Sequence, residues 1–148
     1  MTGPRRDWAT DTERALADAG YRSGGARRAL LELLDEQRCA LSAVEIEDIL
    51  RTRTRRVSRA SIYRILEELE RLDAIQRVEI GQGMVRYEAV RAGKGHHHHL
   101  VCDHCGALRP FSDPELERTI ERLSRRVPLA VSDHEVVLRG ACADCELG

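Results

Sequence analysis

The chain has 148 residues and a net charge of −1, with 42% hydrophobic and 33% charged residues. This length excludes a large multidomain enzyme, and the composition is that of a globular protein with one domain or two small ones. No apolar run approaches the roughly 18 to 20 residues that cross a bilayer, and the first residues lack the apolar stretch of a secretion signal. We therefore expect a cytoplasmic protein that does not contact a membrane.

Four helices are predicted in the first part of the chain. The capping boxes Thr10-x-x-Glu13 and Ser42-x-x-Glu45 predict the starts of the first and third helices, and Ser23 precedes the second. Ser58 is the expected N-cap of the fourth, which is the most regular. Its apolar stripe consists of Ile62, Ile65, Leu66, Leu69 and Leu72.

After Leu72 the period of the apolar residues changes from 3.6 to 2. Val78 and Ile80 alternate with polar residues, residues 81–83 supply a Gly-rich turn, and the alternation resumes at Val85. This predicts a β-hairpin. Small helices followed by a hairpin form a winged helix-turn-helix, in which the helix before the hairpin enters the DNA major groove. We expect an α+β chain with such a domain at residues 1–90.

Six arginines and no acidic residue fall within residues 51–64. A run of like charges is usually a solvated face, and that interpretation is the simplest alternative. Here the arginines stand directly ahead of the helix expected to enter the groove, so we favour contact with DNA phosphates.

Residues 91–95 contain two glycines and no large apolar residue, which is typical of a hinge. A second domain is predicted from residue 96 to 148. We expect a strand over residues 98–101, a helix opened by Asp113 and Pro114, and a strand over residues 134–139. Three apolar residues of that helix should face inward, namely Leu116, Ile120 and Leu123.

Four of the five cysteines form two C-x-x-C pairs, namely Cys102, Cys105, Cys142 and Cys145. Two such pairs suit tetrahedral zinc, because a two-residue turn lets both thiolates reach one ion, and four thiolates close its coordination sphere. We predict a structural zinc site. Free buried cysteines and a redox role for one pair are the alternatives, and Cys39 stands alone.

A run of four histidines, residues 96–99, opens the second domain. In an extended segment His96 and His98 point to one face, and His97 and His99 point to the other, so one segment can supply two metal sites. Further ligands are available at Glu88, Glu117 and His134. Imidazole and carboxylate donors suit zinc, iron, nickel or manganese. The alternatives are a cluster without function and a purification tag, and the tag is rejected because the run continues directly into a strand. We expect His104 to be an exposed loop residue.

These residues resemble the ferric uptake regulator family of metal-sensing bacterial repressors. The resemblance extends from about Gly20 to Cys145, and its most specific parts are HHHHLVCDHCG at 96–106, HEVVLRGACADC at 134–145 and SRASIYRILEELERLDAI at 58–75. It implies a homodimer with an N-terminal winged-helix domain and a C-terminal α/β dimerisation domain.

The family's metal ligands carry over to particular residues of this chain. The resemblance implies that Cys102, Cys105, Cys142 and Cys145 hold structural zinc; that His96, His98, Glu117 and His134 form a second site; and that Glu88, His97 and His99 form part of a regulatory hinge site. Where many members place a histidine, this chain has Ala40, with Cys39 beside it. Gln76 and Val90 stand where zinc-sensing members often carry an acid and a cysteine. The fourth hinge ligand, for which Cys39 is a candidate, and the metal, Zn²⁺ or Fe²⁺ with Mn²⁺ or Ni²⁺ as further candidates, are therefore left open.

We predict a metal-dependent repressor of metal homeostasis genes, of iron or zinc uptake, that binds a palindromic operator as a homodimer. Tyr63 and Arg64 are the candidates for base contacts, and Arg22, Arg55, Arg56 and Arg59 are the candidates for phosphate or minor-groove contacts. Two alternatives remain. One is a peroxide sensor of the same fold. The other is a zinc-dependent hydrolase, for which the sequence offers no catalytic motif, so we expect no enzyme.

Overall fold

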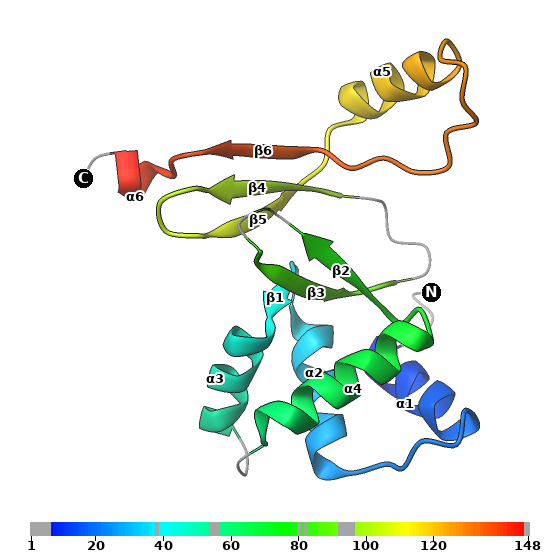
Figure 1. Ribbon diagram of the computed structural model, residues 1–148, viewed down its shortest axis with the longest axis vertical. Helices are drawn as coiled ribbons and strands as arrows, with labels where there is room; N and C mark the ends of the chain where they lie inside the picture. The colour runs from blue at the N-terminus through cyan, green and yellow to red at the C-terminus, as the bar shows by residue number, and fades with distance from the viewer. Residues whose placement is uncertain are drawn as a thin grey trace, which may run out of the picture. The chain divides into compact units, whose positions relative to one another are not determined.

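The computed structural model describes residues 7–37, 39–53, 57–79, 81, 83–91 and 97–146 (Figure 1). The predicted DNA-contacting Arg55 and Arg56, the predicted ligand His96 and most of the predicted hinge lie outside these residues. The chain forms two units, residues 1–94 and residues 95–148. None of the described helices combines the length and the apolarity needed to cross a membrane.

Four helices and a small sheet build the N-terminal unit. The helices are α1 (Trp8–Asp18), α2 (Gly25–Glu36), α3 (Ala43–Arg53) and α4 (Arg59–Arg71). The strands are β1 (Leu41–Ser42), β2 (Ile75–Glu79) and β3 (Val85–Ala89), and they pair antiparallel in the order β1-β3-β2. The hairpin β2–β3 directly follows α4, as in a winged helix-turn-helix.

Two of the four predicted helix starts are correct. The Ser42 hydroxyl accepts from the backbone N–H of Glu45 (3.1 Å), and the Glu45 carboxylate accepts from the backbone N–H of Ser42 (3.3 Å), so the capping box precedes α3 as predicted. Ser58 caps α4 by accepting from the backbone N–H of Ser61 (3.1 Å). The last turn of α4 leads through Asp73 into β2.

The predicted starts of α1 and α2 are wrong. Asp7 caps α1 by accepting from the backbone N–H of Ala9 (3.2 Å), and the hydroxyl of Thr10 donates to the same carboxylate (2.9 Å). Thr10 is therefore inside the helix and supports the cap. The N-cap of α2 is Gly24, which has no capping side chain, so Ser23 does not take that role.

The hydrophobic core of the N-terminal unit brings together all four helices and the sheet. Its members share near-complete burial and include Leu16, Leu30, Leu33, Ile46, Leu50, Ile62, Ile65, Leu66 and Leu69. The predicted stripe of α4 is thus the face that packs inward, and Leu72 packs against it in a partly buried position. On the opposite side of α4, residues such as Tyr63 and Arg64 are exposed.

A three-stranded sheet and two helices build the C-terminal unit. The strands are β4 (His98–Cys102), β5 (Leu108–Phe111) and β6 (Val137–Gly140), and the helices are α5 (Pro114–Ser124) and the short α6 (Ala143–Glu146). The strand order is β5-β4-β6, with β5 antiparallel and β6 parallel to β4.

The C-terminal unit adds one strand to the prediction and corrects two expectations. The sequence did not indicate β5. The last strand starts at Val137 and not at residue 134, and the backbone N–H of His134 donates to the side chain of Asp133 (2.8 Å). The predicted inward face of α5 is only partly covered within the chain, since Leu116 and Ile120 are half-buried and Leu123 is 55% exposed. Asp113 does cap α5 ahead of Pro114, as predicted.

Candidate metal centres and nucleic-acid interface

The sheet of the C-terminal unit brings the two C-x-x-C pairs together. Cys102 ends β4, and the parallel pairing with β6 places it opposite Gly140, two residues before Cys142. Each pair is folded by a short turn, in which Gly106 donates to the carbonyl of Cys102 and Cys145 donates to that of Cys142 (both 2.9 Å). Gly106 has a φ of 75°, which a residue with a side chain adopts at a cost.

The four thiol sulfurs lie within 4.8 Å of one another. A zinc tetrahedron with Zn–S bonds of about 2.3 Å has sulfur–sulfur edges of about 3.8 Å. The distance between the Sγ atoms of Cys105 and Cys142 is 3.8 Å. Both the type of the donors and their spacing therefore fit a closed, structural zinc site.

The thiols of this cluster differ in acidity. Backbone N–H groups of Cys105 and Cys142, the latter 3.3 Å from the sulfur, lower the pKa of Cys102 to about 6. Hydrogen bonds among the sulfurs, first with Cys142, raise the pKa of Cys145 to about 12. The protein alone therefore favours one thiolate, and a bound cation is needed to hold four.

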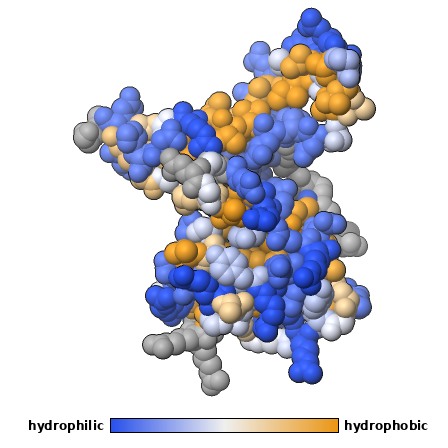
Figure 2. Space-filling view, in the orientation of Figure 1, coloured by the Kyte–Doolittle hydropathy of each residue, from blue (hydrophilic) through white to orange (hydrophobic). Residues whose placement is uncertain are grey.

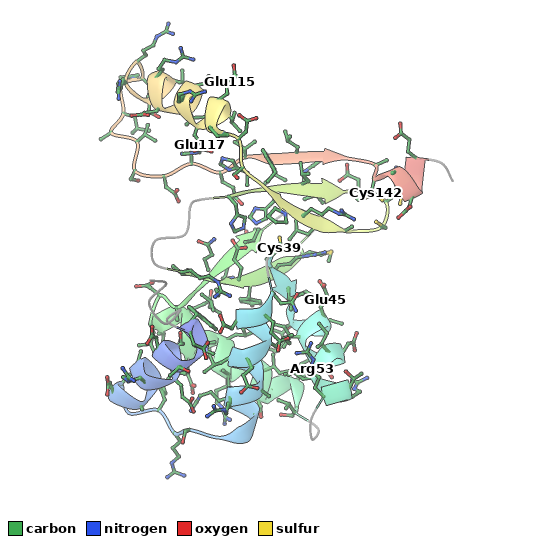
Figure 3. The ribbon with its side chains drawn as sticks, turned by 180° about the vertical axis from the view of Figure 1, so that it is seen from behind. Cys39, Glu45, Arg53, Glu115, Glu117 and Cys142 are labelled. Atoms are coloured by element: carbon green, nitrogen blue, oxygen red, sulfur yellow. The ribbon has the colours of Figure 1, made fainter. Side chains whose placement is uncertain are left out.

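A second cluster joins β4, α5 and the segment before β6. Glu117, labelled in Figure 3, is in the first turn of α5 and contacts the imidazoles of His98 and His134. Its Oε1 is 2.5 Å from Nε2 of His98, and its Oε2 is 2.8 Å from Nε2 of His134. The hydrogen bond from His98 is the main reason why the pKa of Glu117 is lowered. All three residues are predicted ligands, and their atoms lie within 4.8 Å of one another.

The backbone fixes the tautomer of His98. The N–H of Val136 donates to Nδ1 of His98 (3.2 Å), so Nε2 carries the proton and donates it to Glu117. A cation bound at Nε2 would replace this proton. The fully buried imidazole is thus already oriented toward the carboxylate that would share the cation with it.

His97 and His99 face each other on another side of the chain. Their ring centroids are 5.0 Å apart in an edge-on arrangement. His98, between them in sequence, contacts Glu117. The Nδ1 atom of His99 is 3.7 Å from the carboxylate of Glu135, which the sequence analysis did not single out. Its position next to His134 could have indicated it, because neighbouring residues in an extended segment face opposite sides.

Two further predicted ligands belong to the N-terminal unit. Glu88 lies on β3, is 5% exposed, and accepts a hydrogen bond from Nε2 of Gln76 (2.5 Å), its cross-strand partner. Cys39 follows α2 and is a half-buried free thiol. Gln76 thus contacts one of the predicted ligands.

The exposed side of α4 carries the predicted DNA contacts. Tyr63 is 47% exposed, and Arg59 and Arg64 are also exposed, while Ile62 and Ile65 between them are buried. Arg22, in the turn before α2, is exposed. Sequence reasoning missed Glu47 of α3, which accepts a hydrogen bond from Arg59 (2.7 Å).

Comparison with known proteins identifies the family. Residues 18–139 match the family model described as "Ferric uptake regulator family". The chain belongs to the ferric uptake regulator family. It is therefore a metal-dependent transcriptional regulator, and this membership argues against the hydrolase alternative.

Its relatives align with the chain over most of their length. The ferric uptake regulation protein of Bacillus subtilis is 30% identical over 135 residues, which cover 90% of this chain and 91% of the relative. The ferric uptake regulator of Helicobacter pylori, described with three functional metal-binding sites, has a TM-score of 0.82 at 26% identity and covers 97% of this chain and 95% of its own. A zinc-bound manganese uptake regulator has a TM-score of 0.75 at 26% identity, covering 88% and 97%. These likenesses confirm the predicted fold class.

Proposed function

We propose that the chain is a homodimeric repressor of metal homeostasis genes that binds a palindromic operator when a divalent metal, Zn²⁺ or Fe²⁺, occupies its hinge site. The observation that supports this proposal most is the division of one histidine strand. His98 contacts Glu117 and His134, whereas His97 and His99 contact each other. One short segment thus offers ligands to two sites.

DNA binding is assigned to α4 and its flanks. The inner face of this helix is held by the core, so Tyr63 and Arg64 can reach base edges without disturbing the fold. Arg22, Arg55, Arg56 and Arg59 are assigned to phosphates or the minor groove. These contacts set the register and the affinity, and the base contacts set the specificity.

A second copy of the chain is the proposed partner of the C-terminal unit. Apolar side chains of α5, the following segment and β6 are left exposed, among them Leu123 (55%), Leu129 (71%) and Leu138 (53%). Figure 2 shows hydrophobic residues gathered over this region. Monomeric proteins rarely leave such residues clustered at their surface, and a homodimer would bury them twice.

The regulatory site is assigned to Glu88, His97 and His99, with Cys39 as the fourth ligand. A divalent ion held by these residues would link the two units. His96, His98, Glu117 and His134 are assigned to a second site, and the four remaining cysteines to structural zinc. Two imidazoles, a carboxylate and a thiolate suit zinc, and the same set without the thiolate suits iron.

The hinge residues act by restricting how the two DNA-binding units of a dimer are oriented. A ligand shifts such an equilibrium only by its differential affinity for the two states. A coupling of about 1 to 3 kcal/mol would change operator affinity roughly 5- to 150-fold. Glu88 is suited to this role because it lies on β3, in the β2–β3 hairpin that directly follows α4.

The test is a titration of operator binding with zinc, iron, manganese and nickel. We expect His97→Ala and Glu88→Ala to abolish the stimulation by metal while the dimer and the cysteine-bound zinc persist. Cys39→Ser should have a smaller effect. His104→Ala is the matched control, since His104 is exposed and outside both predicted histidine sites. If stimulation survives in the first two variants and is lost in Glu117→Ala, the regulatory role belongs to the other site.

A further inference from the structure

A carboxylate between two arginines links α3 to the start of α4. The Oε2 atom of Glu47 accepts from Nε of Arg59 (2.7 Å), and its Oε1 accepts from Nη2 of Arg51 (3.0 Å). The Glu47 side chain is only 15% exposed, whereas the two arginine side chains are 61% and 63% exposed. The acid is therefore held in place, and the two bases extend from it into solvent.

The pairing keeps both groups charged. The hydrogen bond from Arg59 is the main cause of the lowered pKa of Glu47, and the same bond raises the pKa of Arg59. A surface hollow of about 460 Å³ lies beside the pair, lined by Glu47, Arg51, Val57 and Ser58. Ser58 is the cap of α4, so the cluster stands at the start of the helix assigned to the DNA groove.

The hydrogen bond to Glu47 occupies only one edge of the Arg59 guanidinium. Its Nε atom binds Glu47, and among the described residues no hydrogen bond involves its two terminal nitrogens. Those nitrogens form the planar fork that binds two oxygens of a phosphate. A long arginine side chain loses rotamer entropy when it is fixed, and a side chain already held at Nε loses less of it on binding.

We propose that Glu47 is a positioning residue for operator binding: it holds Arg59 by Nε so that the terminal fork is presented to a DNA phosphate. This inference rests on the proposed DNA-binding role of α4. The competing effect is simple repulsion, because an acid near the DNA backbone opposes binding. The two effects predict opposite signs when Glu47 is replaced.

The test measures the operator Kd of the metal-saturated full chain at several salt concentrations. We expect Glu47→Ala to raise the Kd by about 3- to 10-fold and to lower the slope of log Kd against log salt by about one. The matched control is Asp48→Ala, because Asp48 is an exposed neighbouring acid 3.9 Å from Arg51. It removes the same charge without releasing Arg59, and should leave the Kd unchanged or lower.

A double-mutant cycle separates positioning from a general effect on folding. If Glu47 acts through Arg59, Glu47→Ala has no further effect on the Kd when Arg59→Ala is already present. Glu47→Gln keeps the volume and one acceptor, and serves if the alanine variant melts early. It should weaken binding by less than Glu47→Ala does.

The outcomes distinguish this inference from the proposed function. Weaker binding in Arg59→Ala together with equal or tighter binding in Glu47→Ala and Glu47→Gln overturns the positioning role and leaves the DNA-binding role of α4 intact. An effect of Glu47→Ala that adds fully to that of Arg59→Ala also overturns it. Unchanged affinity in both Arg59→Ala and Arg64→Ala would refute the proposed function itself.

Discussion

Removal of one cysteine ligand should unfold the C-terminal unit selectively. Within residues 97–146 only His98, His99, Val101 and Cys102 are buried. Val101 is the one aliphatic side chain among them, and its burial contributes about 1.5 to 3 kcal/mol. Ordering the backbone costs about 1 to 2 kcal/mol for each residue. Burial within this unit therefore cannot offset the cost of ordering it.

Zinc can supply the missing stability. Structural zinc sites contribute roughly 10 to 16 kcal/mol of apparent binding free energy at neutral pH, and this energy is available only to the folded state. The site joins the end of β4 to the residues after β6, so it closes the sheet at one end. Cys142→Ser removes one of the four thiolates, and most of that free energy should be lost.

Hydrogen exchange read by mass spectrometry provides the assay, because it resolves the two units within one chain. In Cys142→Ser we expect peptides from β4 and β6 to lose protection and peptides from α2 and α4 to keep it, since the core of the N-terminal unit is separate. Zinc content should fall by one ion per chain, and the dimer should dissociate. Cys39→Ser, in the N-terminal unit, is the control for the exchange measurement only, because Cys39 is itself assigned to the regulatory site.

One result would refute this reasoning. If Cys142→Ser kept the protection of β4 and remained dimeric after losing its zinc, the unit would be stabilised by something other than the ion. The contacts between two copies would then be the first candidate, and the apolar residues around Leu129 would be the ones to replace.

Three further outcomes test the helices and their contacts. Arg64→Ala should weaken operator binding by about 1 to 3 kcal/mol and Tyr63→Phe by less, with metal content unchanged; fluorescence anisotropy showing no loss in either would remove α4 from the recognition role. Arg27→Ala should lower the free energy of unfolding, measured in urea, by about 3 to 5 kcal/mol, because it leaves the nearly buried Glu68 carboxylate without Arg27. The double variant Arg27→Met with Glu68→Leu should recover most of the lost stability. Arg91→Ala should lower the free energy of unfolding by about 1.5 to 3 kcal/mol in the same assay, since Arg91 donates to both the carboxylate and the carbonyl of Asp35 at the end of α2 (2.5 and 2.6 Å). An unchanged unfolding midpoint would contradict this.

The sequence predicted a helix start correctly where a single residue was the evident N-cap. Ser42 and Ser58 cap α3 and α4 as expected, because each is followed at the right spacing by the group it binds. The start of α1 could be misplaced because Asp7 and Thr10 are both good caps three residues apart, and only the structure shows that the hydroxyl donates to the carboxylate. Gly24, the N-cap of α2, has no side chain, so no capping residue marks this helix start in the sequence.

Contacts between segments that are far apart in the chain could not be predicted from the sequence. β5 contains Arg109 and Pro110, which argue against a strand, and it is tolerated because it lies at the edge of the sheet. The apolar stripe of α5 predicts that one face is covered, but periodicity does not say whether the same chain or another copy covers it. The ion pair of Glu47 with Arg59 spans twelve residues and depends on how α3 meets α4.

The opposite sides of His98 and His99 were predictable because β4 pairs with a strand on each edge. His98 is registered with Phe111 on β5, and His99 is registered with Val137 on β6. A slip of one residue would exchange the two faces and would break both pairings at once, so His98 and His99 keep their opposite sides. Spacing alone could not supply the carboxylates that complete each face. Glu117 reaches His98 because Asp113 fixes the first turn of α5, and this is a contact of the folded chain rather than of the sequence.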